Sequence, residues 1–310
     1  MVALAAAAVS NELLFLPTRE PTKRGASQMT EEDYRADRFF IYGGGGAAIA
    51  AEPSKESVLA DLMRVRGIGE AYANELYEKG VRSTKELVGA PGIPESIQLF
   101  ARYIDDLEHE LDLESAKKFV GWLEAFIMRA ATGKKGHAHS LLAVEDVIIA
   151  GAHRRGVSST HDIDVVVVGE REEGKTAMAS QSSSISEAMH VILSPLPSYL
   201  GTLLRGEKKY SFLWKLFDNA TVIDVVICPS SERGATLLHT TGPSTLNILL
   251  RKRAISLGMT LSEHGLFESG ASKTLIHAAT EEGIFKALGL PYIAAKDRDS
   301  EEAKKMVAAK

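Results

Sequence analysis

The sequence is poor in cysteine, in long apolar runs and in excess positive charge. Cys228 is the single cysteine among 310 residues, which excludes an internal disulfide and a cysteine-rich zinc site and favours a reducing compartment. No stretch approaches the ~18 consecutive apolar residues that a membrane-spanning helix needs, so no membrane partner is expected. The formal net charge is -5 at pH 7, so any binding to nucleic acid has to come from local basic patches.

The remaining composition is that of an ordinary soluble globular protein. Hydrophobic residues make up 45% of the chain and charged residues 25%, enough apolar side chains for one large core or two to three smaller ones. The alanine-rich start, residues 1–9, lacks the basic region of a secretion signal. We therefore interpret it as a floppy terminus.

Periodicity divides the chain into four parts and predicts an α+β protein. Residues 1–56 include four consecutive glycines, show no sustained period and are expected to be flexible or poorly ordered. Residues 57–127 carry apolar side chains at three- and four-residue spacing, which predicts a small helical unit. Residues 144–228 combine a helix with short runs rich in β-branched side chains, which predicts a small sheet. Residues 232–310 are expected to form a small α/β subdomain.

Individual elements follow from the same patterns. The expected helices span residues 57–65, 70–80, 96–111, 114–127, 177–192, 244–257 and 280–288. The expected strands span residues 144–150, 163–168 and 221–228, with weak strands between 259 and 267. In the helix over 244–257, Ser244 is the expected N-cap and Gly258 the expected stop.

Three aspartates in apolar strands are the most informative residues. Asp162 and Asp164 lie two positions apart in a strand, so their carboxylates project to the same side. Asp224 is likewise an acidic residue inside another apolar strand. Three carboxylates converging from neighbouring strands are hard oxygen ligands of the kind that Mg²⁺ prefers. A bare Asp-x-Asp is more often a solvent-facing strand end, so the segment before it decides the interpretation.

That preceding segment can hold phosphates. The strand over 144–150 runs into Gly-Ala-His-Arg-Arg-Gly at 151–156, a glycine-flanked turn with two arginines. A turn that frees backbone amides and supplies a guanidinium can bind a triphosphate, while nearby carboxylates hold the metals that bridge its oxygens. The sequence therefore predicts a phosphate-binding turn beside a metal-binding group of carboxylates.

This order of motifs resembles the nucleotidyltransferase superfamily and, within it, the family X DNA polymerases of the polymerase beta and lambda type. The order continues in Gly-Ile-Gly at 67–69, Leu-x-x-Gly-x-x-Lys-Tyr at 203–210, Thr-Gly at 241–242, Gly-Leu-Phe at 265–267 and Lys-Asp-Arg at 296–298. The resemblance implies a helix-hairpin-helix subdomain (57–113), a catalytic palm (114–231) and a C-terminal subdomain that contacts nucleotide and template (232–310).

By resemblance, Asp162, Asp164 and Asp224 form the catalytic centre. The first two bind both Mg²⁺ ions, for which Mn²⁺ can substitute, and the third joins the catalytic metal. The implied reaction is in-line attack of the primer 3′-hydroxyl on the α-phosphate, with pyrophosphate as leaving group. Val222 departs from the family, which commonly has a basic residue two positions before the third aspartate, so slower chemistry is expected.

The resemblance assigns the triphosphate of the incoming nucleotide to the turn over 151–156. Arg155 and the amides around Gly151, Ala152 and Gly156 are its implied ligands, and Gly242 is a further implied nucleotide contact. The family usually has Ser where Ala152 stands, so one phosphate hydrogen bond is missing. Weaker nucleotide binding is the expected consequence.

The helix over 244–257 carries the implied base contacts. Asn247 and Arg251, four apart, share one helical face that can reach minor-groove acceptors. By resemblance, Asn247 contacts the incoming base, Arg251 the template strand and Lys252 the DNA, although a solvated basic face is the simpler interpretation of Lys252. His239 and Thr240, also implied nucleotide contacts, replace the Tyr-Phe pair that the family commonly uses to exclude ribonucleotides. We therefore expect relaxed sugar discrimination.

The segment over 65–71 matches the helix-hairpin-helix pattern. Gly67, Gly69 and Ala71 are expected at a tight turn whose amides face a DNA phosphate without reading sequence. The resemblance adds a monovalent cation, Na⁺ or K⁺, held by the main-chain carbonyls of Val65 and Ile68. Residues 1–56 show neither a second hairpin nor a Schiff-base lysine, so no 5′-deoxyribose phosphate lyase activity is expected.

The implied function is that of a DNA-directed DNA polymerase that fills short gaps in repair without proofreading. Its expected partners are primer–template or gapped DNA and dNTPs, and the expected state is a monomer. Two alternatives stay open: template-independent terminal or other nucleotidyl transfer, and a DNA-end-binding module whose catalysis has decayed. The expected location is the nucleus in a eukaryote, and otherwise intracellular or viral.

Overall fold

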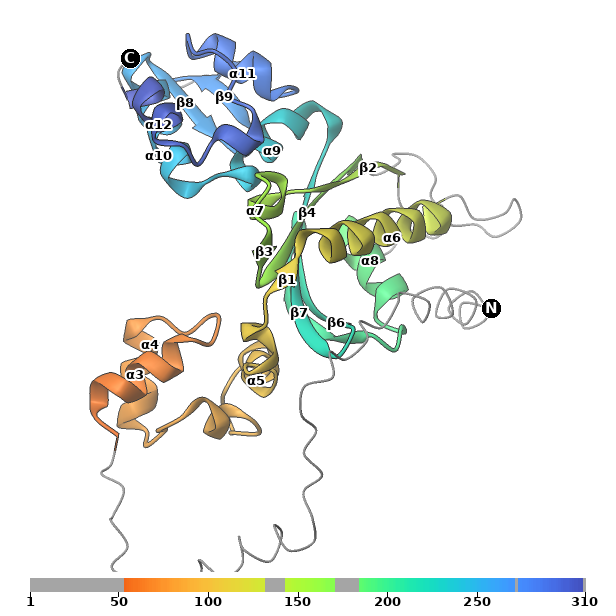
Figure 1. Cartoon of the computed structure of the whole chain (residues 1–310), viewed down its shortest axis with the longest axis vertical. Helices are drawn as coiled ribbons and strands as arrows, with labels where there is room; N and C mark the ends of the chain where they lie inside the picture. The colour runs from red at the N-terminus through yellow and green to blue at the C-terminus, as the bar shows by residue number, and fades with distance from the viewer. Residues whose placement is uncertain (1–52, 132–142, 171–183, 271–272, 309–310) are drawn as a thin grey trace, which may run out of the picture. The chain divides into compact units, whose positions relative to one another are not determined.

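The computed structural model describes residues 53–131, 143–170, 184–270 and 273–308 (Figure 1). Residues 1–52 and the first half of the helix expected over 177–192 therefore lie outside the described residues. The chain separates into two compact units, Met1–Glu86 and Leu87–Lys310. None of the helices in the described ranges has the length and apolarity of a membrane span.

The first unit is a pair of short helices, as expected from the periodicity. Helices α3 (Lys55–Met63) and α4 (Glu70–Glu78) pack through side chains that are fully buried, Val58, Leu62 and Leu76. The hydroxyl of Ser54 caps α3 by accepting from the amide of Ser57 at 3.2 Å. The chain turns between the helices at Gly67, whose φ of 95° is a left-handed value that favours glycine.

A five-stranded mixed sheet is the centre of the second unit. Its order is β2-β4-β7-β6-β5, in which β4 and β7 run parallel and the other neighbours antiparallel. Three of the strands match the predicted ones, whereas β5 and β6 were not expected. A separate two-stranded ribbon joins β1 (Leu111–Asp112) to β3 (Ser159–Thr160). The strands of the main sheet are β2 (Ala143–Ile149), β4 (Asp162–Glu170), β5 (Tyr199–Arg205), β6 (Lys209–Leu216) and β7 (Asn219–Cys228).

Helices α6 (Leu113–Ala131) and α8 (Ile185–Leu193) accompany this sheet (Figure 1). Phe119, Leu123 and Ile127 recur on one face of α6 at four-residue spacing and are fully buried. The ring of Trp214 on β6 lies 5.9 Å from that of Phe119, between centroids. Apolar periodicity in α6 thus places the helix on the sheet.

The helix expected over 96–111 is wrong in its extent. Helix α5 (Glu95–Arg102) ends before Tyr103, and a 3₁₀ turn, η2 (Asp106–Glu108), precedes β1. The break lets Leu107 join Leu99 in packing against β6 and β7, a contact that one continuous helix would not make. Burial against the sheet therefore overrides the helical pattern.

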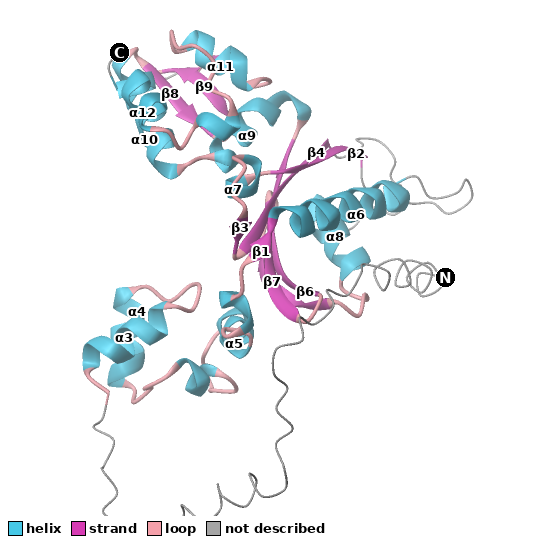
Figure 2. Cartoon of the chain, viewed as in Figure 1, coloured by secondary structure: helices cyan, strands magenta, loops and turns pink. Residues whose placement is uncertain are grey.

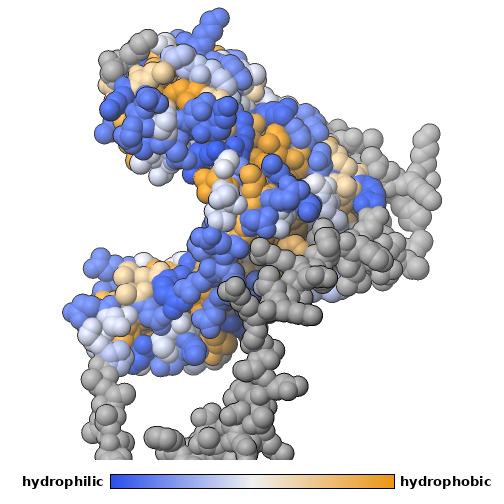
Figure 3. All heavy atoms as spheres, viewed as in Figure 1, coloured by the Kyte–Doolittle hydropathy of each residue, from blue (hydrophilic) through white to orange (hydrophobic). Residues whose placement is uncertain are grey.

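The C-terminal part of the second unit has its own core. Helices surround a small sheet of order β10-β9-β8 (Figure 2), and the visible surface of this part is largely hydrophilic (Figure 3). Helix α12 was not expected, yet its Ala303 and Val307 are buried in this core. The elements are α9 (Arg233–Thr241), α10 (Ser244–Ser256), β8 (Met259–Ser262), β9 (Gly265–Glu268), β10 (Leu275–His277), α11 (Glu281–Ala287), η4 (Ala295–Asp297) and α12 (Glu301–Ala308).

One predicted cap of α10 is wrong and one prediction of its end is confirmed. Pro243 occupies the N-cap position and Ser244 is the first helical residue, with no side-chain cap. Proline needs no partner for an amide hydrogen, which suits it to a helix start. Gly258 follows the C-cap with a φ of 71°, as expected of a glycine that ends a helix.

Candidate active site

The three predicted carboxylates lie on two neighbouring parallel strands. Asp164 of β4 stands directly beside Asp224 of β7, and Asp162 stands beside Val222. Register partners in a sheet point to the same face, and so do residues two apart, so all three carboxylates share one face. Each is partly exposed, whereas the residue that follows each of them is buried.

These carboxylates have the ligand chemistry that a divalent cation prefers. Asp164 and Asp224 sit side by side on one face of two interior strands, where like charges repel and a cation would compensate them. Among the described residues, no three His, Cys, Asp or Glu side chains are gathered closely enough to hold a metal ion as they stand. A bound cation would draw the oxygens of Asp162, Asp164 and Asp224 together.

Gly151 packs closely against Asp164, one of these carboxylates. It begins the short helix α7 (Gly151–Arg154), directly after β2, and the amide of Ala150 donates to the carbonyl of Asp164 at 2.8 Å. The φ of Gly151 is 58°, and a Cβ atom there would lie 1.9 Å from Asp164 Oδ2. Only glycine therefore allows the predicted phosphate-binding turn to approach the carboxylate this closely.

The other predicted triphosphate ligands have partners within the protein. The amide of Gly156 donates to the carbonyl of His153 at 3.0 Å. Arg155 donates from Nε to Asp299 Oδ2 and from Nη1 to the carbonyl of Thr241, each at 2.6 Å. Both acceptors belong to the C-terminal part, so Arg155 links that part to the turn that follows β2.

Sequence reasoning missed a buried ionic network next to Arg155. Arg154 donates from Nη1 and Nη2 to the carboxylate of Glu281 at 2.9 and 2.7 Å, and Arg298 donates to the same carboxylate at 2.8 Å. Glu281 is 5% exposed and Arg298 fully buried. Because 127 positions separate Arg154 from Glu281, no local pattern indicates the contact.

Burial and ion pairing shift the pKa values of this network in opposite directions. Burial alone would raise the pKa of Glu281, but hydrogen bonds and charge from Arg154 and Arg298 outweigh it and hold the pKa below its ordinary value. Burial alone would lower the pKa of Arg154, but the hydrogen bonds and the negative charge of Glu281 outweigh burial, so the pKa of Arg154 is raised. Glu281 and Arg154 therefore both carry their charge at neutral pH.

The predicted base contacts gather around His239. Asn247 Nδ2 donates to the carbonyl of His239 at 2.8 Å, and Arg251 Nη2 lies 3.2 Å from His239 Nδ1. Burial lowers the pKa of His239, so the imidazole is neutral at pH 7 and Nδ1 can accept from Arg251. Thr240 donates to the carbonyl of Thr236. A hollow here is lined by Ala235, Leu238, His239, Asn247, Arg251, Leu261 and Ser262.

Lys252 lies apart from these contacts as an exposed residue of α10. In the first unit, the predicted hairpin exposes Gly67, Gly69 and Ala71, while the side chains of Val65 and Ile68 are buried beneath it. The carbonyl of Val65 already accepts from the amide of Ile68 at 3.0 Å. An exposed backbone on buried apolar anchors suits a contact with a phosphate.

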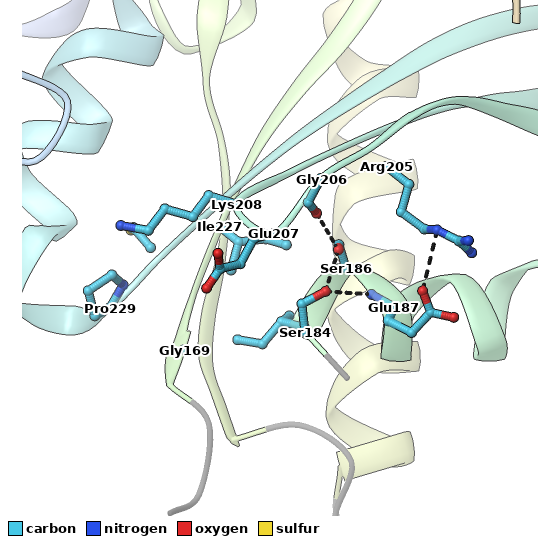
Figure 4. Close-up of a pocket in the computed structure, with 12 residues that line it drawn as sticks. Gly169, Ser184, Ser186, Glu187, Arg205, Gly206, Glu207, Lys208, Ile227 and Pro229 are labelled. Atoms are coloured by element: carbon cyan, nitrogen blue, oxygen red, sulfur yellow. Dashed lines mark hydrogen bonds and ion pairs between the residues drawn. The ribbon is translucent and has the colours of Figure 1, made fainter. Parts of the chain in front are cut away.

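A larger hollow of about 570 Å³ lies elsewhere in the second unit (Figure 4). It sits by Gly169 and Cys228, near the carboxyl ends of β4 and β7, whereas Asp162 begins β4. Its lining mixes charges, including an ion pair of 3.3 Å between Arg205 and Glu187. Because the hollow lies at the opposite ends of these strands from Asp162, it takes no part in the candidate site.

The described residues form an α+β fold in which a carboxylate-bearing parallel strand pair adjoins a glycine turn. The family model for the DNA polymerase beta thumb matches residues 236–299. The structure of a ternary gap complex of Leishmania infantum polymerase beta is similar at a TM-score of 0.66 and 18% identity, covering 95% of this chain and 99% of that one.

Two curated relatives extend the similarity. Human DNA-directed DNA/RNA polymerase mu is 26% identical over 270 residues, which cover 76% of this chain and 51% of that protein. Rat DNA polymerase lambda is 25% identical over 255 residues, which cover 78% and 42%. The chain thus spans about half the length of these relatives. The chain is therefore similar, over about three quarters of its length, to DNA polymerases mu and lambda, and it carries a segment that matches the polymerase beta thumb.

Proposed function

We propose that the protein is a Mg²⁺-dependent, DNA-directed DNA polymerase that fills short gaps in DNA repair and lacks proofreading. The observation that carries this proposal is the register of Asp164 beside Asp224, with Asp162 on the same face and Gly151 packed against it. Similarity to polymerases mu and lambda supports the reaction class.

Asp162, Asp164 and Asp224 would hold two divalent cations, Mg²⁺ or Mn²⁺. Bound there, these ions supply charge that lowers the pKa of the primer 3′-hydroxyl and stabilises the transferring phosphoryl group. Asp224 itself would lie against the attacking hydroxyl and accept its hydrogen bond. The buried residues that follow each carboxylate hold the two strands in register, so that only the carboxylate side chains would have to move toward a bound cation.

The remaining contacts divide between nucleotide and DNA. Arg155, with the amides of Gly151 and Ala152, would bind the triphosphate, and Asn247 and Arg251 would contact the minor-groove side of the new base pair. The exposed hairpin at Gly67 would bind a backbone phosphate, with Na⁺ or K⁺ on its carbonyls. We also propose a monomer, located in the nucleus if the source is eukaryotic.

Primer extension on three substrates tests the proposal. The full chain would be assayed with Mg²⁺ and dNTPs on gapped, nicked and single-stranded DNA, with DNA binding measured in parallel. Extension that copies the template opposite a gap is the expected result. Untemplated extension of single strands would identify a terminal transferase, and DNA binding without extension on any substrate would leave only a binding module.

A second proposal concerns the sugar of the nucleotide. His239 and Thr240 stand where the family commonly has an aromatic pair, and the human relative is named a DNA/RNA polymerase. We propose that this protein also incorporates ribonucleotides. The ratio of deoxy- to ribonucleotide incorporation measures this, and a ratio as high as that of an enzyme with the Tyr-Phe pair would overturn it.

A further inference from the structure

Arg155 and Arg154 are neighbours in sequence but differ in the carboxylates that they bind. The partner of Arg154, Glu281, is 5% exposed and also binds Arg298. The partner of Arg155, Asp299, is an exposed residue whose side chain is 50% accessible. One ion pair is therefore fixed within the core, whereas the other can open toward solvent.

The pair between Arg155 and Asp299 occupies donors that a phosphate would use. Nε of Arg155 donates to Asp299 Oδ2 at 2.6 Å, and Nη1 donates to the carbonyl of Thr241 at 2.6 Å. A guanidinium binds carboxylate and phosphate through the same planar set of donors. A phosphate that approaches Nε must therefore displace Asp299.

The backbone beside Asp299 is held in place, so the displacement is a side-chain movement. Its neighbour Arg298 is fully buried and donates from Nε to the carbonyl of Ile293 at 3.1 Å and from Nη1 to Glu281. On the other side, Ser300 starts α12, whose Ala303 and Val307 are buried. Only the carboxylate of Asp299 has to turn away, and water can replace its partner.

We propose that Asp299 is an internal competitor of the nucleotide triphosphate for Arg155. In the nucleotide-free protein its carboxylate keeps the guanidinium in position, and it leaves when a triphosphate of higher negative charge binds. The same carboxylate would return as pyrophosphate departs. This inference rests on the proposed function, because that function assigns the triphosphate to Arg155.

The test compares Asp299→Ala with the matched variant Asp297→Ala in the full-length protein. Asp297 is an exposed acid two positions away with the same charge, so its loss changes net charge equally. Single-turnover insertion into a one-nucleotide gap would give the apparent Kd of dNTP and the maximal rate separately. Asp299→Ala should lower the Kd about two- to fivefold, the range that an exposed ion pair supports, at an unchanged rate.

Two further variants separate competition from a merely structural role. Asp299→Glu keeps the carboxylate and should retain the wild-type Kd. In an Arg155→Ala background, Asp299→Ala should change nothing, because the contested guanidinium is gone. An unchanged or raised Kd for Asp299→Ala in the wild-type background would overturn the proposal, as would an equal fall for Asp297→Ala.

Binding of inorganic tripolyphosphate with Mg²⁺, measured by calorimetry, distinguishes this inference from the proposed function. If the protein proves inactive on every DNA substrate, the proposed function fails while calorimetry still decides the inference. Tighter tripolyphosphate binding by Asp299→Ala than by both the wild type and Asp297→Ala supports the competition. Equal binding by all three proteins contradicts it.

Discussion

Charge is arranged in opposite ways in two regions: the carboxylate-bearing face of β4 and β7, and the contact between α7 and the C-terminal part. On that face, Asp164 and Asp224 place like charges side by side and remain partly exposed. At the contact, the carboxylate of Glu281 lies buried between the guanidiniums of Arg154 and Arg298. The first arrangement is suited to an incoming cation, and the second to holding two parts of the protein together.

This comparison predicts that substitutions on the carboxylate-bearing face of β4 and β7 have the largest effect on activity. Asp164→Asn should reduce nucleotide insertion by about 10³-fold or more, since groups that act as a unit lose most of their effect together. Thermal stability should change little, because the substitution also removes a like-charge repulsion. Insertion assays and thermal unfolding of the same preparations check both parts.

The matched control for that variant is Asp218→Asn. Asp218 is an exposed residue in the turn between β6 and β7, on the same hairpin as Asp224. It should retain wild-type insertion. Equal losses in the two variants would mean that overall charge, and not the shared face of β4 and β7, governs the reaction.

At the other region, Glu281→Gln should mainly affect stability. Removing one partner from a buried ionic network leaves uncompensated charge and costs about 3–5 kcal/mol, a fall in Tm of roughly 6–20 °C for a unit of this size. Glu282→Gln, at the exposed neighbouring position, should stay within about 0.5 kcal/mol of the wild type. Similar unfolding free energies for the two variants would show that the network contributes nothing.

The same network predicts a dependence of stability on pH. The pKa of Glu281 is lower in the folded protein than its ordinary value of 4.5. Its contribution is therefore complete above the unfolded pKa and is lost as pH falls through the lower, folded pKa. Tm measured between pH 7 and pH 3 should fall more steeply for the wild type than for Glu281→Gln, and parallel curves would contradict this.

Gly151 connects the two regions, and its replacement should have an intermediate effect. In Gly151→Ala, the new Cβ would lie 1.9 Å from Asp164 Oδ2, in addition to the strain of a positive φ. Gly258→Ala has the same kind of φ, but its Cβ would meet nothing within 4 Å, so it should cost only about 1–2 kcal/mol. Chemical denaturation should rank Gly151→Ala as the less stable, and only this variant should also lose insertion activity.

The smallest expected effect concerns the sugar. The double change His239→Tyr with Thr240→Phe should raise the ratio of deoxy- to ribonucleotide incorporation by about tenfold, because one added steric contact is expected to discriminate by about 1.4 kcal/mol. Competition between a dNTP and the matching rNTP in one gap measures the ratio. A fall in the ratio would contradict the idea that the missing aromatic pair causes the relaxed sugar discrimination.

The two regions also differ in how far sequence could predict them. Asp162, Asp164 and Asp224 sit in runs of β-branched residues, so period and composition placed them on strands, and a motif order indicated their family. The strands β5 and β6 were missed because they depend on tertiary pairing, β6 with β7 and β5 with β6, and α12 was missed because only two of its side chains enter the core. The partners of Arg154 and Arg155 were unpredictable, since contacts across more than 100 positions leave no local pattern.

Insertion of one complementary dNTP into a one-nucleotide gap tests the central claim most directly. Wild type, Asp224→Ala and Asp218→Ala would be compared with Mg²⁺ present and after its removal by a chelator. The account predicts insertion by the wild type and Asp218→Ala only when Mg²⁺ is present, and none by Asp224→Ala. Insertion by Asp224→Ala at the wild-type rate, or insertion without any divalent cation, would contradict it.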